Sequence, residues 1–302
     1  MTRPARQIPT TRNTFSTGRL DRLGRLRKDT ERLAVHLADG ERVVIPICGA
    51  RVATSMGDAG PSIATLEITE VDENDLWLLG EIDGTTYVAI DLDDDGLDRR
   101  DLPDDIRWSG LREIAAMLDE DDANILATAT GLAHWHRTHR YCGACGAETV
   151  ADWSGHRRRC DGCNREHFPR TDPAIIVLVT HDDRALLARN PAWPRGFSSV
   201  LAGFVEPGES LEDAVAREVK EEVGLTVETV TYESSQPWPF PSSIMLGFRA
   251  EATNDALDPD PEEIADACFY TRDELAHGAV GMPPPMSIAR RLIDDWIAEE
   301  DA

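Results

Sequence analysis

One stretch of the chain, residues 203–225, combines a tight turn with a helix whose buried face becomes acidic. It reads GFVEPGESLEDAVAREVKEEVGL. Pro207 and Gly208 are typical of a turn. Ser210 is a favourable helix N-cap, and Gly224 is a favourable C-terminal stop. The sequence therefore predicts a loop that leads into a helix of about three turns, a common helix length.

On the apolar face of this predicted helix, the positions nearer its C-terminal end are glutamates. The stripe that begins at Leu211 leads, in steps of three and four residues, to Glu218, Glu221 and Glu222. Carboxylates this close together repel one another, and their burial is costly unless a cation accompanies them. Such oxygen ligands suit Mg²⁺ or Mn²⁺, which commonly bridge to substrate phosphates. The alternative interpretation is a solvated acidic helix face.

The same stretch resembles the Nudix box, G-x5-E-x7-R-E-U-x-E-E-x-G-U, where U is an aliphatic residue. The resemblance to Nudix hydrolases implies metal-assisted attack of water on a diphosphate that joins a nucleoside to another group. It also implies that the three glutamates hold the metal ions, and that Glu209 and Arg217 brace the loop and the helix. The matching positions are Gly203, Glu209, Arg217, Glu218, Val219, Glu221, Glu222, Gly224 and Leu225.

Four of the six cysteines form two close pairs, with the spacing C-x2-C-x14-C-x2-C: Cys142, Cys145, Cys160 and Cys163. Two such turns can place four thiolates at the corners of a tetrahedron, as a structural Zn²⁺ ion requires. A closed site of four sulfurs has no open position, so we expect a structural rather than a catalytic metal. The alternative is a set of reduced or redox-active thiols. So few cysteines in 302 residues predict a reducing cytoplasm.

Charge is distributed unevenly. The chain has 56 acidic and 31 basic residues, a net charge of −25, which argues against broad nucleic-acid binding. The acidic, lysine-poor composition fits either a high-salt cytoplasm or a GC-rich genome. Around the cysteines the charge reverses, and this basic region either accepts phosphates or pairs with carboxylates of the chain. No apolar run approaches the roughly 20 residues that span a bilayer, so we expect no membrane association.

The pattern of predicted elements indicates an α+β protein of three parts. These are a small α+β domain (1–140), a zinc ribbon (141–170) and a Nudix domain (171–302). The last is expected to be an α/β/α sandwich with a mixed sheet. Pro46 predicts that strand 42–48 lies at a sheet edge. The other N-terminal expectations are a basic, poorly ordered arm within 1–28 (or a transit peptide), a continuous or broken helix within 13–37, strands at 62–70, 74–81 and 85–92, and two helices within 109–139.

Residues 235–243, SQPWPFPSS, are the segment that indicates the substrate. Three prolines exclude a regular strand or helix beyond the edges of this segment, and they hold Trp238 and Phe240 in a stiff loop. Rigid aromatic rings stack on flat heterocycles, with about 1–3 kcal/mol per base. The alternative is a proline-rich turn with its aromatic rings packed inward.

This loop, with the Nudix box and the upstream cysteines, resembles the NADH diphosphatase family, the NudC proteins. The resemblance covers nearly the whole chain, from about Leu20 to the PPPMSIARRL segment near the C-terminus. It implies hydrolysis of NAD(H) at its diphosphate to nicotinamide mononucleotide and AMP. It also implies removal of an NAD cap from the 5′ end of RNA, leaving a 5′-monophosphate. The substrate pocket of the family is built from two subunits, so a homodimer is implied.

The family's motifs also assign the catalytic residues. Glu218, Glu222 and Glu263, with the backbone of Ala202, are expected to hold the catalytic metal ions. Glu221 is expected to be a further ligand or the base that deprotonates water.

Substrate contacts follow in the same way. Phe168 and Phe204 occupy the positions of an aromatic pair that stacks on the nicotinamide or adenine ring. Gly155 stands about where relatives can carry an acidic substrate contact, so that contact is in doubt. The other implied substrate contacts are Gln236, Pro237, Trp238, Pro239, Phe240, Pro241, Ser242, Ser243, Ala289 and Arg112.

Two other functions stay open. One is a different nucleoside-diphosphate hydrolase, such as one that acts on ADP-ribose; the proline-aromatic loop argues against it. The other is a nucleic-acid-binding regulator that uses its zinc ribbon and carries an inactive Nudix fold. The complete set of glutamates argues against the second.

Overall fold

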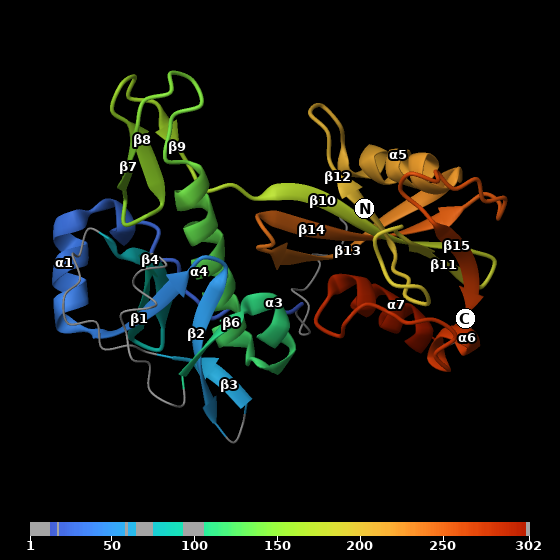
Figure 1. Ribbon diagram of the computed structural model, residues 1–302, viewed down its shortest axis with the longest axis horizontal. Helices are drawn as coiled ribbons and strands as arrows, with labels where there is room; N and C mark the ends of the chain where they lie inside the picture. The colour runs from blue at the N-terminus through green and yellow to red at the C-terminus, as the bar shows by residue number, and fades with distance from the viewer. Residues whose placement is uncertain (1–12, 17, 58–59, 65–74, 93–105, 300–302) are drawn as a thin grey trace, which may run out of the picture. The chain divides into compact units, whose positions relative to one another are not determined.

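The computed structural model describes residues 13–16, 18–57, 60–64, 75–92 and 106–299 (Figure 1). The chain divides into two compact units. Unit 1 contains the N-terminal residues up to 17, residues 175–236 and the chain from 246 onward. Unit 2 contains residues 18–174 and 237–245. The proline-aromatic loop therefore lies almost wholly in unit 2, although the chain on both sides of it belongs to unit 1.

Unit 1 is built around one sheet, in the order β13-β14-β10-β11-β15, with β12 paired to β10. Figure 1 shows α5 on one face of this sheet and α6 and α7 on the other, which confirms the predicted α/β/α sandwich. Its elements are β10 (Asp172–His181), β11 (Arg184–Arg189), β12 (Leu201–Phe204), α5 (Leu211–Val223), β13 (Val227–Trp238), β14 (Ser243–Ala252), β15 (Asp266–Thr271), α6 (Arg272–Ala276) and α7 (Ile288–Ala298).

The core of unit 1 lies between the sheet and α5. Ile175 and Val177 of β10 pack with Val215 and Val219 of α5, and all four side chains are fully buried. The continuous apolar run of β10 is typical of a strand that is covered on both faces. The core therefore fixes the apolar half of α5 on the sheet and, with it, the start of the acidic half.

Both ends of α5 follow the sequence prediction. The Ser210 hydroxyl accepts a hydrogen bond from the amide of Asp213 at 3.1 Å. Gly224 ends the helix in the left-handed conformation, with φ of +76°, where a residue with a Cβ would be strained.

The N-terminal part of unit 2 is a second six-stranded sheet, in the order β3-β2-β1-β5-β4, with β6 paired to β2. Its elements are η1 (Leu26–Lys28), α1 (Thr30–Asp39), β1 (Glu41–Cys48), β2 (Arg51–Gly57), β3 (Gly60–Ile63), β4 (Trp77–Ile82), β5 (Thr85–Leu92), β6 (Ile106–Gly110), α3 (Leu111–Ile114), η3 (Ala115–Met117) and α4 (Glu120–Thr138).

Two helices pack against opposite faces of this sheet. Leu33 of α1 belongs to a buried cluster with Leu76 and Leu78 of β4 and its flank. Trp77 lies between these leucines in sequence and points to the other face, where its ring stacks on His136 of α4 at 4.2 Å. The alternation of the strand therefore separates the two contacts.

One expectation for this region was wrong. Strand β1 lies inside the sheet, between β2 and β5, and not at its edge. Pro46 is tolerated there because β2 pairs with β1 only at Ile47 and Cys48. Strands β2 and β6 were not predicted. The predicted helix within 13–37 is confined to η1 and α1, and most of the predicted strand 62–70 lies outside the described residues.

The N-terminal arm is also more ordered than expected where it is described. Phe15 is fully buried, and Asn13 is 7% exposed. The Asn13 amide donates to the Ser235 carbonyl at 2.8 Å, and its oxygen accepts from Arg291 at 3.1 Å. These contacts hold the arm on unit 1.

The proline-rich segment differs from the prediction too. Strand β13 continues through Pro237 to Trp238. Because β13 is the edge strand of its sheet, the missing amide of Pro237 does not interrupt a ladder on both sides. The loop proper is therefore short and connects β13 to β14.

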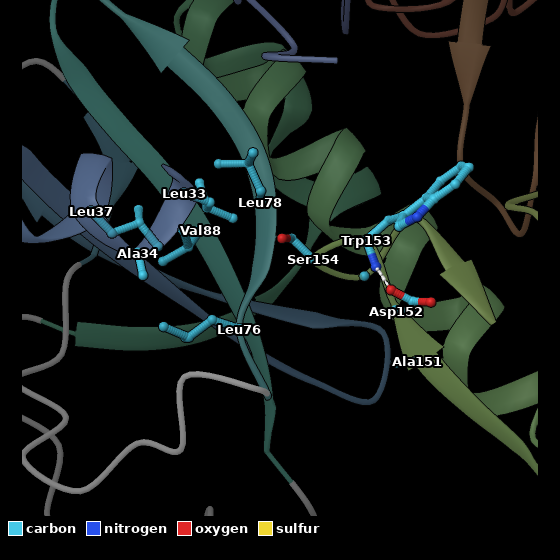
Figure 2. A pocket seen from close by; sticks show the side chains of 11 residues that line it. Leu33, Ala34, Leu37, Leu76, Leu78, Val88, Ala151, Asp152, Trp153 and Ser154 are labelled. Atoms are coloured by element: carbon cyan, nitrogen blue, oxygen red, sulfur yellow. Dashed lines mark hydrogen bonds between the residues drawn. The ribbon is translucent and has the colours of Figure 1, made fainter. Parts of the chain in front are cut away.

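The cysteine region is a small sheet, β7 (Thr149–Asp152), β8 (Arg157–Cys160) and β9 (Glu166–His167). Its β7–β8 turn is attached to the N-terminal sheet, because Ser154 accepts from the Leu78 amide at 3.0 Å. Figure 2 shows Leu33, Leu37 and Val88 around a cavity of about 210 Å³ that this turn closes. The turn and the N-terminal sheet are therefore parts of one packed unit.

Candidate active site and metal centre

Arg217 is the central hydrogen-bond donor of the glutamate cluster. Its guanidinium binds both carboxylate oxygens of Glu209, at 2.7 and 3.0 Å. It also donates to Glu218 at 2.9 Å, to Glu221 at 3.0 Å and to the Phe204 carbonyl at 2.9 Å. These bonds, with Glu209 first, raise the pKa of Arg217 further above its usual range. Arg217 thus joins the loop, β12 and α5, and its donors all point to protein oxygens.

Glu218 lies directly against the backbone of β12. A Cβ atom added to Gly203 would lie 1.9 Å from the Glu218 carboxyl carbon. Only glycine at this position therefore leaves room for the carboxylate. Burial raises the pKa of Glu218, although its bond to Arg217 opposes the shift.

Glu222 is the least satisfied of the carboxylates. It is 7% exposed, and its Oε2 atom is buried with no hydrogen-bond partner among the described residues. Burial, followed by repulsion from Glu218, Glu263 and Glu221, raises its pKa to about 8. A buried and unpartnered carboxylate oxygen costs free energy unless a cation is bound to it.

The other two glutamates are open to solvent. The Glu221 side chain is 61% exposed, and Glu263, just before β15, is exposed as well. Glu263 is close enough to repel the charges of Glu218 and Glu222. The cluster thus has a buried side and an exposed side. Hard oxygen donors in this arrangement fit a divalent cation such as Mg²⁺ or Mn²⁺.

The four clustered cysteines form a compact group. Their sulfur atoms all lie within 4.8 Å of one another. Sγ of Cys142 is 3.8 Å from that of Cys163, and Sγ of Cys145 is 3.4 Å from that of Cys160. Amides of Ala144 and Cys145 lower the pKa of Cys142 to about 6, which favours the thiolate. The six cysteines form no disulfide, so these thiols can serve as metal ligands.

Three family models match the chain in order. An NADH pyrophosphatase-like rudimentary NUDIX domain matches residues 32–135, an NADH pyrophosphatase zinc ribbon domain matches residues 137–168, and a NUDIX domain matches residues 170–295. A protein from Stutzerimonas stutzeri (strain A1501) named NAD-capped RNA hydrolase NudC is 43% identical over 223 residues, which are 73% of this chain and 76% of that protein.

The chain belongs to the NudC family of Nudix hydrolases. A second NudC, from Pseudomonas syringae pv. syringae (strain B728a), is 46% identical over 194 residues, 64% of this chain and 68% of its own length. The resemblance found in the sequence is thereby confirmed. The zinc ribbon model and the four sulfurs together make the cysteine group a structural zinc site, and the Nudix domain indicates dependence on a divalent metal.

Two positions expected to contact substrate in a NudC protein are buried in unit 1. Gln236 is fully buried: its amide donates to the carbonyls of Thr14 and Met286, and its oxygen accepts from the Ile288 amide at 2.8 Å. Ala289 follows in the first turn of α7 and is 5% exposed. Gln236 therefore ties the end of β13 to the start of the helix that carries Ala289.

The aromatic positions of the NudC motifs are exposed. Phe204 in unit 1 is 61% exposed and Phe168 in unit 2 is 49% exposed. Within unit 2, Trp238 contacts Phe240 edge to face at 5.1 Å, and the Arg112 guanidinium lies 5.5 Å from the Trp238 ring. Arg112 thus packs on the loop itself. Among the other loop residues, Pro239 is buried, and Ser242 and Ser243 are half-buried.

One aromatic residue of the ribbon, Trp153, was not predicted from the sequence. The Trp153 ring lies 5.9 Å from that of Phe168, and Lys28 and Arg157 lie 4.5 and 4.0 Å from it. Gly155, two residues later, has φ of +87°, and a Cβ there would collide with Trp77 at 2.6 Å. No side chain fits at position 155, so an acidic contact from that position is absent in this chain.

Internal pairing accounts for several of the basic residues around the cysteines. Arg137 pairs with Asp91, Arg157 with Asp152 and Glu166, and Arg170 with Asp172. No helix among the described residues is long and apolar enough to cross a membrane.

Proposed function

We propose that this chain hydrolyses the diphosphate of NAD(H) to nicotinamide mononucleotide and AMP. We also propose that it removes the NAD cap from RNA and leaves a 5′-monophosphate. The two NADH pyrophosphatase family models support the first activity, and the names of the two relatives support the second. The observation that carries the proposal is the Glu222 Oε2 atom, which is buried, repelled by three carboxylates and without a hydrogen-bond partner in the part of the chain that the structure describes.

The residues present fit the divalent metal that such a reaction requires. Glu218, Glu222 and Glu263, with the backbone of Ala202, would hold the ions, with Glu221 as a further ligand. When bound, Mg²⁺ or Mn²⁺ would neutralise the diphosphate oxygens and make water more acidic. Arg217 is a positioning residue in this proposal, because its donors are already used by Glu209, Glu218 and Glu221.

The reaction is an in-line displacement. The oxygen of a water molecule forms a bond to one phosphorus, and the bond from that phosphorus to the bridging oxygen breaks. The proton of the water passes to a glutamate, Glu221 or Glu222. Glu221 is placed to release it again because its side chain is largely exposed.

The substrate is held by the aromatic pair and the loop. Phe168 and Phe204 are both exposed, as two rings that stack on a nicotinamide or adenine would have to be. Because the pair is expected to come from two subunits, we propose a homodimer. We also propose a cytoplasmic location, in keeping with only six cysteines in 302 residues.

A parallel product analysis tests the proposal. The protein is incubated with Mg²⁺ or Mn²⁺ and with NADH, NAD-capped RNA or ADP-ribose, and the products are separated by chromatography. We expect reduced nicotinamide mononucleotide from NADH and nicotinamide mononucleotide from NAD-capped RNA, at rates well above the release of AMP from ADP-ribose. Preference for ADP-ribose would replace the proposed substrate, and RNA binding without any cleavage would favour an inactive regulator.

A further inference from the structure

The loop between β11 and β12 presents a tryptophan ring to solvent. We call residues 190–197, NPAWPRGF, the tryptophan loop, and they lie wholly within unit 1. Trp193 is 40% exposed, and it belongs neither to the glutamate cluster nor to the cysteine group. Tryptophan is enriched at binding surfaces, because its large flat ring gains much from being covered. The position of the loop indicates what could cover this ring.

Hydrogen bonds hold the tryptophan loop between two segments that carry expected site residues. At the start of the loop, the Asn190 side-chain amide donates to the Glu263 carbonyl at 3.2 Å, and Glu263 is an expected metal ligand. At its end, the Gly196 carbonyl accepts from the Gly281 amide at 2.7 Å. Residue 281 leads into α7, which carries Ala289, an expected substrate contact. The loop therefore lies at the border of the proposed reaction site.

The Trp193 ring is fixed in place by its own loop. The Trp193 amide donates to the Asn190 carbonyl at 3.0 Å, and the Asn190 side-chain oxygen accepts from the Ala192 amide at 3.0 Å. The ring meets Phe197 edge to face at 5.3 Å. A ring that is already held in one position loses little conformational entropy when a ligand covers it.

The loop and the strand end before it are positively charged. Arg189 and Arg195 flank Trp193, and no acidic residue occurs from residue 184 to residue 205. Arg189 donates to the Trp193 carbonyl at 3.4 Å, which is a neutral acceptor, and Arg195 is exposed. Neither guanidinium forms an ion pair within the described part of the chain.

The other arginines that the structure describes in unit 1 differ in this respect. Each forms an ion pair with a carboxylate: Arg184, Arg217, Arg249, Arg272, Arg290 and Arg291. In a chain with a net charge of −25, the two arginines on either side of one exposed tryptophan thus retain their charge for an external anion.

An aromatic ring between two such cations is the combination that binds single-stranded nucleic acid, because bases stack on the ring and phosphates face the cations. We propose that the tryptophan loop binds the RNA nucleotides that follow the NAD cap. One base lies on Trp193, and the phosphates beside it face Arg189 and Arg195. This inference rests on the proposed removal of NAD caps, and it adds a surface that free NAD does not use.

Steady-state kinetics with NAD⁺ and with NAD-capped RNA test the proposal. In Trp193→Ala the KM for the capped RNA should rise at least about fivefold, because a stacked base is lost. The KM for NAD⁺ and the kcat for both substrates should stay native, since the metal ligands are unchanged. Trp193→Phe should recover part of the affinity for capped RNA, because a phenylalanine ring also stacks.

Tyr232→Ala is the matched control. Tyr232 is 39% exposed and also meets a phenylalanine edge to face, Phe248 at 5.7 Å, but it belongs to β13. It should leave both KM values native. If Trp193→Ala changed the two KM values equally, or changed neither, the inference would be wrong while NAD⁺ cleavage upheld the proposed function. A native chain that cleaved neither substrate would refute the proposed function and this inference with it.

The positive charges are tested separately through salt. Each phosphate of a single strand that a cation neutralises contributes about 0.7 to the slope of log KM against log salt. Arg195→Gln should therefore raise the KM for capped RNA at low salt and lower this slope by about 0.7. Arg184→Gln removes a charge from the other end of β11, where Arg184 pairs with Asp255, and should keep the native slope. An unchanged slope in Arg195→Gln would contradict a phosphate contact there.

NAD-capped RNAs of increasing length locate the nucleotides that are bound. In the native chain the KM should fall from NAD⁺ to a cap followed by the first few nucleotides, and then level off, because the loop offers one ring and two cations. Trp193→Ala should show a smaller fall over the same lengths. A native KM that is equal for NAD⁺ and for every RNA length would overturn the proposal.

Discussion

The glutamates of α5, which are proposed metal ligands, and the zinc-binding cysteines of the ribbon are two clusters with opposite designs. The cysteines lie on two turns that face each other, and all four sulfurs converge within 4.8 Å. The glutamates project from one side of a single helix, and one of them, Glu221, is largely exposed. A site enclosed by two turns can close around an ion, whereas a site on one helix face stays open on the other side. The closed design suits a structural metal. The open design suits a metal that must also bind a substrate.

The two clusters also differ in the groups that stabilise their negative charge. Backbone amides of the turn stabilise the Cys142 thiolate. The glutamates rely on one arginine, which reaches Glu209, Glu218 and Glu221 but not Glu222. The four predictions that follow test this contrast.

The largest effect is expected for Glu222→Gln. An amide preserves the shape of the side chain but cannot supply a negative oxygen to a cation, so folding should be retained while metal binding is lost. NADH turnover should fall by at least about 1,000-fold, or about 4 kcal/mol. Glu212→Gln, at an exposed position of the same helix, is the control and should remain active. Near-native turnover of Glu222→Gln would refute the assignment of this residue.

Replacement of one zinc ligand should instead reduce stability. We expect Cys145→Ser to lose zinc and about 3 kcal/mol of folding free energy, with a Tm about 10 °C lower, and to form less dimer. Cys268→Ser changes an exposed cysteine outside the cluster and should melt like the native chain. Unchanged melting and zinc content in Cys145→Ser would mean that the ribbon does not depend on the metal.

Acid should destabilise unit 2 through His136. This histidine is buried against Trp77 and Gly155, and burial lowers its pKa from 6.5 to about 4. The unfolded chain therefore binds the proton more readily, and stability is lost as the pH falls from 6.5 toward 4. Between pH 7.5 and 5 the loss from this group should be about 2 kcal/mol.

Urea unfolding at the two pH values measures this loss. His136→Gln should remove that part of the pH dependence, and His134→Gln, at a less buried position of the same helix, should retain it. Identical pH dependence in all three proteins would show that His136 is not held neutral in the folded chain.

The smallest effect is expected for Arg217→Lys, which keeps the charge but cannot bind Glu209 with two parallel bonds. We expect NADH turnover to fall about tenfold, or about 1.4 kcal/mol, with a higher metal concentration needed for half activity. Arg184→Lys changes another ion pair of unit 1 and is the control. A kcat that is unchanged at every metal concentration would limit Arg217 to a role in folding.

The helix that carries the glutamates was predictable because its signals are local. Ser210, Gly224 and the apolar stripe determine where α5 begins, ends and packs, through contacts no more than four residues apart. The N-terminal sheet was less predictable. Pro46 is usually a mark of an edge strand, and its tolerance in β1 depends on where β2 begins to pair, which no local pattern encodes.

The sequence by itself determined the four zinc ligands, the position of the glutamate cluster, the caps of α5 and the family. These depend on spacing along the chain, because a helix repeats every 3.6 residues and a tight turn brings its two cysteines together. Only the tertiary structure decided that the Glu222 Oε2 atom has no hydrogen-bond partner among the described residues, that Gln236 is buried, and that Arg27 binds His156. Those outcomes depend on which distant segments pack together, and burial then sets the cost of each charge.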